Sequence, residues 1–187
     1  MPNLVEVHYE QTGQSKSINE YGMRDMQQKA YSQRDARYLL LKAPPASGKS
    51  RALMFIALDK LINQGIKKVI VAVPERSIGG SFGTTDLKSF GFYSNWEPNP
   101  KYNLCTTEDN KSKVVTFKEF LESDERILIC THATLRFAFD QLSESKFNNT
   151  LLAIDEFHHV SADGENKLGE VLRNLIEKSN CHIVAMT

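Results

Sequence analysis

One short segment of the chain combines residue types that bind phosphate. Residues 43–50 read Ala-Pro-Pro-Ala-Ser-Gly-Lys-Ser and lie between an apolar run, residues 38–41, and a longer apolar segment, residues 51–62. The run is typical of a buried strand and the segment of a helix, so the Gly-Lys-Ser triplet falls where a strand passes into a helix N-terminus. The free backbone N–H groups of a first helical turn and the helix dipole both favour an anion there.

In such a loop the side chains take separate roles. We expect the Lys49 ammonium to reach the β- and γ-phosphates of a nucleotide and the Ser50 hydroxyl to ligate Mg²⁺. The residues expected around the phosphates are Pro45, Ala46, Ser47, Gly48, Lys49 and Ser50. Because Gly-Lys-Ser also occurs by chance, the loop alone leaves the function open.

A pair of acids farther along the chain supplies the complementary chemistry. The apolar run 151–154 leads directly into Asp155-Glu156-Phe157-His158. An apolar strand that ends in two acids is typical of an ATPase site, in which Asp155 holds Mg²⁺ through water and Glu156 activates the attacking water. Each acid could instead be a solvated carboxylate at a strand end. With both halves present in this order, the sequence favours nucleotide binding.

Composition limits the class of protein. The 187 residues fit one domain of ordinary size, with 25% charged and 41% hydrophobic residues, as in soluble globular proteins. No apolar run reaches the ~18 residues of a membrane helix, and the first residues lack the pattern of a signal peptide, so we expect a cytoplasmic protein without membrane contact. The formal net charge is zero. Any contact with a polynucleotide must therefore come from a local groove.

The cysteines and histidines of the chain are candidate zinc ligands. Cys105, Cys130 and Cys181 are odd in number and far apart, which favours reduced thiols. A search for zinc ligands would collect Cys130, His132, His158, His159, Cys181 and His182. Cys130 and His158 are expected near the carboxyl ends of their strands, whereas Cys181 and His182 open the last strand. The two groups are therefore expected at opposite edges of the sheet, which disfavours a zinc site.

Strands and helices are predicted to alternate along the chain. Expected strands are an edge strand at 3–9, then 38–41, 69–73, 127–130, 151–154 and 182–186; expected helices are 22–37, 51–62, 117–122 with a capping box at Thr116, a helix ending at Leu142, and 168–176. This order predicts an α/β domain with a mostly parallel sheet and helices on both faces. Such sheets bind ligands beyond the carboxyl ends of the strands. The residues at those ends are Lys49, Pro74, Thr131, Asp155 and Thr187.

The segments between these elements are less informative. Residues 11–19 are polar and predict a loop, and residues 77–83 are glycine-rich and predict irregular structure. Residues 88–113 predict a long surface excursion with a short hairpin. Trp96 within it either stacks on a base or packs the loop onto the domain body, and the second is the commoner role.

Six motifs in order give the chain a family likeness. They are Arg24-x-x-Gln27, the loop at 43–50, Pro74-Glu75-Arg76, Thr131-His132-Ala133-Thr134, Asp155-Glu156-Phe157-His158 and Met186-Thr187. With them the chain resembles the first RecA-like domain of a superfamily 2 DExH helicase or translocase, and is most similar to the helicase subunits of type III restriction enzymes. The resemblance implies a single RecA-like P-loop NTPase domain at 21–187, after an N-terminal extension with the edge strand at 1–20.

The resemblance also implies residue roles, a cofactor and partners. Arg24 and Gln27 would bind adenine or hold the motif that binds it, with ATP and Mg²⁺ as cofactors. His158 would link the acids to the coupling motif that begins at Thr187. A DNA or RNA strand would contact Pro74, Arg76, Thr131 and His132. A second RecA-like domain would supply arginine fingers worth roughly 10³ to 10⁵ in rate, so we expect this chain alone to bind nucleotide and hydrolyse it very slowly.

Three departures from the family pattern are visible. Pro45-Ala46-Ser47 replaces the frequent Thr-Gly-Ser, Glu75 stands where Thr is usual, and only the first threonine of the Thr-Ala-Thr coupling motif is present. Two other classes remain open. A terminase-like packaging motor shares the loop and the acids but has no need of His158 or Arg24-x-x-Gln27. A non-catalytic binding module has no need of Lys49 and both acids.

Overall fold

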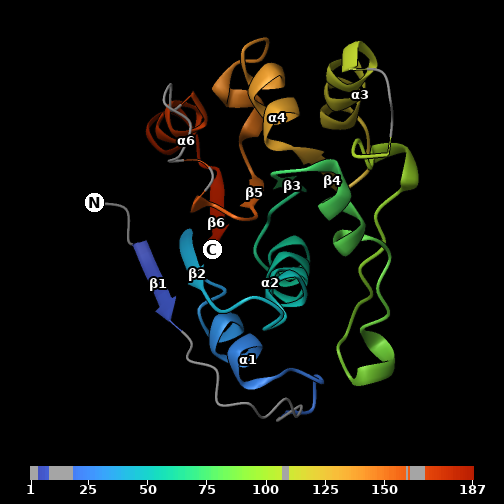
Figure 1. The fold of residues 1–187 in the computed structure, drawn as a ribbon, viewed down its shortest axis with the longest axis vertical. Helices are drawn as coiled ribbons and strands as arrows, with labels where there is room; N and C mark the ends of the chain where they lie inside the picture. The colour runs from blue at the N-terminus through green and yellow to red at the C-terminus, as the bar shows by residue number, and fades with distance from the viewer. Residues whose placement is uncertain (1–3, 9–18, 107–109, 159, 161–166) are drawn as a thin grey trace.

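A single parallel sheet forms the centre of the domain. The computed structural model describes residues 4–8, 19–106, 110–158, 160 and 167–187. All six strands of the sheet run parallel, in the order β1-β2-β6-β5-β3-β4 (Figure 1). The strands are β1 (Leu4–His8), β2 (Tyr38–Lys42), β3 (Lys68–Val73), β4 (Ile127–Thr131), β5 (Thr150–Ile154) and β6 (His182–Met186). The predicted α/β fold with a parallel sheet is confirmed.

Helices cover both faces of the sheet. The α-helices are α1 (Asp25–Ser32), α2 (Lys49–Asn63), α3 (Asn110–Glu122), α4 (His132–Phe139) and α6 (Lys167–Lys178); short 3₁₀ helices are η1 (Arg76–Phe82), η2 (Lys88–Phe90), η3 (Pro100–Tyr102) and η4 (Glu144–Phe147). Helices α1 and α2 pack on one face, and α3, α4 and α6 on the other (Figure 1). The fold is therefore a three-layer sandwich.

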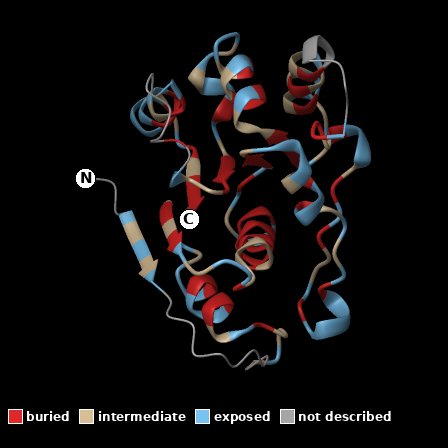
Figure 2. Cartoon of the chain, viewed as in Figure 1, coloured by how far each residue is buried: buried red, intermediate tan, exposed pale blue. Residues whose placement is uncertain are grey.

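Successive strand residues serve the two cores alternately. In β3, Val69 and Val71 pack with α1 and α2, whereas Ile70 and Ala72 pack with the helices of the opposite face. A strand buried on both faces needs apolar residues at every position, which explains the unbroken apolar runs of the sequence. Figure 2 shows the central strands and α2 buried, in contrast to β1. The pairing of β1 with β2 confirms the predicted edge strand.

Several predicted boundaries are wrong. The helix expected at 22–37 is only Asp25–Ser32, and the one expected to end at Leu142 ends at Phe139. The capping box at Thr116 is wrong, because α3 already begins at Asn110 and Thr116 lies inside it. In the added turns Lys113 is only 3% exposed, so this part of the helix also packs against the domain, which stabilises it.

The connecting segments also differ from expectation in part. Residues 77–83 are mostly the 3₁₀ helix η1 rather than irregular chain. The predicted loop at 11–19 lies outside the described residues except for Asn19. Trp96 is fully buried, donates Nε1–H to the Phe82 carbonyl oxygen at 2.7 Å and forms a short antiparallel bridge with Thr85. Trp96 therefore packs the segment 88–113 onto the domain, and its ring is not exposed for a base to stack on.

The three cysteines are buried and free of disulfides. Burial raises the pKa of Cys105 and Cys130, and raises that of Cys181 to about 12. Such thiols are poor nucleophiles at neutral pH. Within the described part of the chain, no helix has both the length and the apolar character that a bilayer crossing requires.

A lysine is buried under the amino ends of the strands. Lys60 of α2 has no solvent exposure, and its Nζ donates to the Ala36 carbonyl at 2.9 Å and to Gln64 Oε1 at 3.3 Å. His182 Nδ1 lies 2.9 Å from the same ammonium. Burial lowers the pKa of Lys60 to about 8, and burial with the adjacent Lys60 charge lowers that of His182 to about 4. The two groups tie the start of β6 to α2.

Lys60→Met should remove a pH dependence of stability. The folded-state pKa lies below the ordinary 10.5, so the unfolded chain binds the proton more tightly and the free energy of unfolding rises between about pH 8 and 10.5. The expected rise is about 3 kcal/mol from this group. Urea unfolding of wild type and variant across that interval measures it. Lys67→Met, which alters an exposed lysine, is the control; parallel curves for wild type and Lys60→Met would contradict the expectation.

Candidate functional site

The phosphate-binding loop is built on two left-handed residues. It joins β2 to α2, with Ala46 at φ 60° and Gly48, the N-cap of α2, at φ 91°. This bend aims the first turn of α2 back toward the sheet edge, where backbone N–H groups at a helix N-terminus favour an anion. Ser47 is buried, and its Oγ has no hydrogen-bond partner in the protein. A buried hydroxyl without a partner fits a loop that receives a ligand.

Gln27 holds this loop from α1. Its side chain is 2% exposed; Oε1 accepts from the Arg24 backbone N–H at 2.9 Å, and Nε2 donates to the Gly48 carbonyl at 3.2 Å. A Cβ on Gly48 would lie 2.5 Å from Gln27 Nε2, so a larger residue there would require the Gln27 amide to shift. The two residues that sequence analysis paired one helical turn apart thus lie against the phosphate loop.

Lys49 connects the loop to the acids. Its Nζ donates to the Ala43 carbonyl at 3.2 Å and lies 3.7 Å from Glu156 Oε1. The side chain is only 11% exposed. An ammonium shielded to this degree keeps most of its attraction for a second anion that approaches the loop. Ser50 follows it in the first turn of α2.

Asp155 is a buried carboxylate at the end of β5. It is 6% exposed, and its Oδ1 accepts from the Glu156 backbone N–H at 3.0 Å. Burial raises the pKa of Asp155, and the adjacent Glu156 carboxylate raises it further, against the smaller opposing effects of Lys49 and His158. The site therefore has a surplus of negative charge that a divalent cation would neutralise. Carboxylate oxygen is also the ligand that Mg²⁺ prefers.

The residues after Asp155 turn sharply and reach the end of β6. Glu156 has φ 49°, an uncommon value for a residue with a side chain. His158 Nδ1 lies 3.3 Å from Glu156 Oε2 and 3.1 Å from Thr187 Oγ1. The backbone carbonyl oxygen of Thr187 in turn accepts from the Ala43 backbone N–H at 3.1 Å. One short chain of contacts thus joins the second acid, the end of β6 and the start of the phosphate loop.

The four residues predicted to contact a polynucleotide do not form one cluster of side chains. Pro74 follows β3, and Arg76 is exposed, with its Nε donating to the Cys105 carbonyl at 3.0 Å. Thr131 caps α4, since its Oγ1 accepts from the Thr134 backbone N–H at 3.2 Å. His132 lies toward the acids, with Nε2 3.0 Å from the Asp155 carbonyl oxygen. Sequence reasoning missed this last contact.

Three observations fit a magnesium nucleotide at this edge. The α2 N-terminus offers backbone N–H groups, the Ser47 hydroxyl has no protein partner, and Asp155 is a buried anion beside Lys49. Together they could hold phosphates through residues 46–50 and Mg²⁺ through Ser50 and Asp155. Among the described residues, no three His, Cys, Asp or Glu side chains gather into a metal site of their own. His159 of the disfavoured zinc set lies outside those residues.

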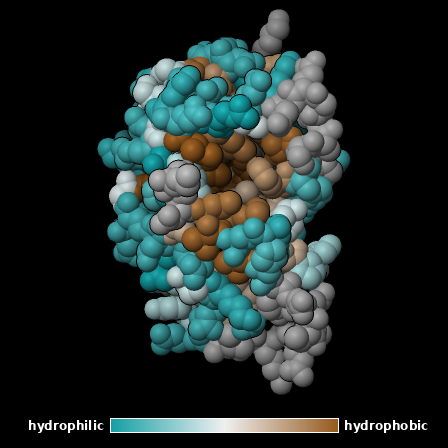
Figure 3. Space-filling model, turned by 90° about the vertical axis from the view of Figure 1, so that its left-hand side faces the viewer, coloured by the Kyte–Doolittle hydropathy of each residue, from teal (hydrophilic) through white to brown (hydrophobic). Residues whose placement is uncertain are grey.

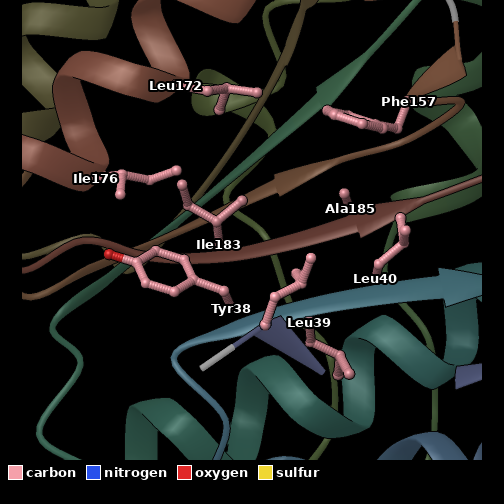
Figure 4. A pocket seen from close by; sticks show the side chains of 9 residues that line it. Tyr38, Leu39, Leu40, Phe157, Leu172, Ile176, Ile183 and Ala185 are labelled. Carbon is pink, nitrogen blue, oxygen red and sulfur yellow. The ribbon is translucent and has the colours of Figure 1, made fainter. Parts of the chain in front are cut away.

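A separate apolar cavity of about 240 Å³ opens beside α6. Figure 3 shows apolar surface around a hollow on this face of the molecule. Its lining residues are Leu4, Tyr38, Leu39, Leu40, Phe157, Leu172, Ile176, Ile183 and Ala185. Tyr38 and Phe157 lie at opposite ends of it (Figure 4). Since no charged group lines it, this cavity cannot serve a triphosphate.

Fold and site together define a RecA-like P-loop domain. Residues 24–187 match the DEAD/DEAH box helicase family. The chain belongs to this family.

Relatives agree with that placement. The chain is 64% identical over all 187 residues to a protein of Bacillus subtilis (strain 168) named "Putative ATP-dependent helicase YeeB", and spans 31% of that protein's length. Similar folds include the Hef helicase domain of Pyrococcus furiosus (TM-score 0.63, 16% identity, 93% of this chain and 35% of that one). They also include the DEAD-box helicase Mss116 solved with ssRNA and UDP-BeF (TM-score 0.61, 16% identity, 98% of this chain and 42% of that one). The UvsW helicase of bacteriophage T4 is a third (TM-score 0.56, 14% identity, 94% of this chain and 56% of that one).

Gly48→Ala should cost more stability than a left-handed backbone alone explains. Gly65 also has positive φ, at 73°, but a Cβ there meets no atom within 4 Å, and a Cβ on Gly80 likewise meets none. We expect Gly65→Ala to lower the free energy of unfolding by about 1 kcal/mol, Gly48→Ala by more, and Gly80→Ala by almost nothing. Urea unfolding of the three variants checks the order. Equal losses at positions 48 and 65 would show that Gln27 yields without cost.

Asp155→Asn should stabilise the nucleotide-free protein. The folded-state pKa of Asp155 is raised above the ordinary 3.8, so the folded state holds the proton more tightly and the free energy of unfolding falls as pH rises through these values. The asparagine variant lacks this loss. We expect higher stability than wild type at pH 7 and a smaller difference near pH 3.5, measured by urea unfolding. Lower stability of the variant at both pH values would contradict the assignment of a strained anion.

Proposed function

We propose that this chain is the ATP-binding RecA-like domain of a DExH-type helicase or translocase. The observation that carries the proposal is the approach of Lys49 and Glu156 at 3.7 Å beside the buried Asp155, because a magnesium triphosphate needs an ammonium from the phosphate loop and two acids from another strand at one edge of the sheet. The family membership and the named relative support it.

Each residue then has a role in the nucleotide cycle. Backbone amides at 46–50 bind phosphates and Lys49 reaches the outer ones, while Ser50 and Asp155 hold Mg²⁺. Glu156 orients the attacking water as its base. When bound, Mg²⁺ neutralises the charge on the phosphates. Gln27 is buried and bonded to Gly48 and Arg24, so of its two expected roles it takes the second and holds the segment that binds adenine.

The polynucleotide is proposed to lie across the ends of β3 and β4. Arg76 is exposed there, and the N-terminus of α4 carries Thr131 as its cap. Mss116, whose structure contains ssRNA, has a similar fold. For this chain we propose a single strand of DNA or RNA as the partner, and a second RecA-like domain that supplies arginine fingers. A type III restriction-like subtype is part of the same proposal, and it rests on the motif likeness alone.

The contact of His158 with Thr187 favours this proposal over a packaging motor. A histidine that joins the second acid to the end of β6 gives hydrolysis a direct connection to the segment after β6. A packaging motor or an idle binding module has no need of that connection. The retained Lys49, Asp155 and Glu156 also argue against an idle module.

Lys49→Ala tests the nucleotide site. Titration of a fluorescent ATP analogue with Mg²⁺ should show at least tenfold weaker binding by the variant, because a charge-assisted contact with phosphate is worth roughly 1.5–3 kcal/mol. Lys67→Ala changes an exposed lysine just before β3, at the opposite edge of the sheet, and should bind like wild type. Equal affinity of wild type and Lys49→Ala would refute the site.

A further inference from the structure

The hydrogen-bond ladder between β5 and β3 lacks one backbone N–H donor, at the point where β5 passes into Asp155. Ala72 pairs with Ile154, and the Asp155 backbone N–H donates to the Ala72 carbonyl at 2.9 Å. In a parallel ladder a residue that donates to one position of its neighbour accepts from the position two residues later. For the Asp155 carbonyl that position is 74, and Pro74 has no N–H.

His132 supplies the missing donor. Its Nε2 lies 3.0 Å from the Asp155 carbonyl oxygen. It is the first residue of α4, directly after β4, which lies on the far side of β3 from β5, so the imidazole reaches across the end of β3. A carbonyl oxygen only accepts, so the hydrogen bond requires the proton on Nε2.

This hydrogen bond acts on the peptide group that orients the carboxylate. The Asp155–Glu156 peptide carries the carbonyl that His132 binds and also the Glu156 N–H, which donates to Asp155 Oδ1 at 3.0 Å. Glu156 is left-handed at φ 49°, so the chain leaves the sheet immediately after this peptide. Without a donor on its carbonyl, the peptide could rotate and release the carboxylate oxygen.

We propose that His132 is a positioning residue that replaces the N–H absent from Pro74, locks the Asp155–Glu156 peptide and so aims the Asp155 carboxylate at Mg²⁺. This inference rests on the proposed function of the site. It reassigns His132 from the polynucleotide to the metal carboxylate. It also explains how a proline can follow β3 without leaving the buried Asp155 carbonyl without a hydrogen-bond donor.

The experiment separates metal positioning from general stability. Affinity for a fluorescent ATP analogue is measured with Mg²⁺ and with EDTA for wild type, His132→Ala, His132→Gln, Pro74→Ala and the double variant Pro74→Ala/His132→Ala. His132→Ala should lose about tenfold in the affinity gained from Mg²⁺, as residues that orient metal ligands do, and keep its affinity in EDTA. His132→Gln, whose amide Nε2 can take the imidazole's place, should recover most of the loss.

The double variant gives the most specific test, because alanine at position 74 restores a backbone N–H for the Asp155 carbonyl. It should therefore bind Mg²⁺-nucleotide better than His132→Ala alone, with Pro74→Ala as the reference of the cycle. Equal losses by His132→Ala in Mg²⁺ and EDTA, or a double variant no better than His132→Ala, overturns the inference.

A nucleotide-independent measurement keeps the two proposals apart. In ¹⁵N NMR of the wild-type chain, neutral His132 should be protonated at Nε2. A wild type without Mg²⁺-dependent binding would defeat the proposed function, whereas protonation at Nδ1 would defeat the role of His132.

Discussion

The unfavourable ionisation of Asp155 is the constraint on which the site depends. Burial at the end of β5 and the neighbouring Glu156 carboxylate both oppose its charge. Lys49, 3.7 Å from Glu156, compensates only in part, and the same lysine also donates to its own loop at Ala43. A protein that keeps two acids so close to one ammonium has a site that favours an additional cation, and a metal-bound polyphosphate satisfies both the lysine and the acids.

The rest of the domain holds these few charges in place. The parallel register brings the carboxyl ends of β2, β3, β4, β5 and β6 to one edge, so residues distant in sequence meet there. Gln27 binds Gly48 and steadies the phosphate loop from α1. Across the edge, His158 joins Glu156 to Thr187. These contacts restrict the motion of the phosphate loop and of the Glu156 side chain.

Stability and function use opposite edges of the sheet. Under the amino ends of the strands, the Lys60 ammonium is buried with His182 and backbone carbonyls as partners. At the carboxyl edge, the Ser47 hydroxyl has no partner and Asp155 carries a raised pKa. Buried polar groups are ordinarily satisfied, so the Ser47 hydroxyl fits a place that a ligand completes. The Tyr38 hydroxyl, at the start of β2, also lacks a protein partner, but it lies at the opposite edge.

Local pattern was enough to predict the strands, the phosphate loop, the two acids and their common edge. Unbroken apolar runs identify doubly buried strands, and a glycine between such a run and a helix identifies the loop, because both patterns follow from backbone geometry within a few residues. The start of α3 was beyond such reasoning, since the turns added before residue 117 include Lys113, whose burial depends on packing in the folded domain. The burial of Trp96 was likewise not predictable from local pattern, because its hydrogen-bond partner Phe82 lies at the end of η1.

His132 shows the division most clearly. Its sequence neighbours gave no reason to connect it with Asp155, although the missing N–H of Pro74 was visible in the sequence. By itself the sequence determined which residues could bind phosphate and metal, and that they follow strands. Only the tertiary structure decided that β3 lies between β4 and β5 in a register that leaves the Asp155 carbonyl facing a proline, because strand order and register arise from packing across the whole sheet.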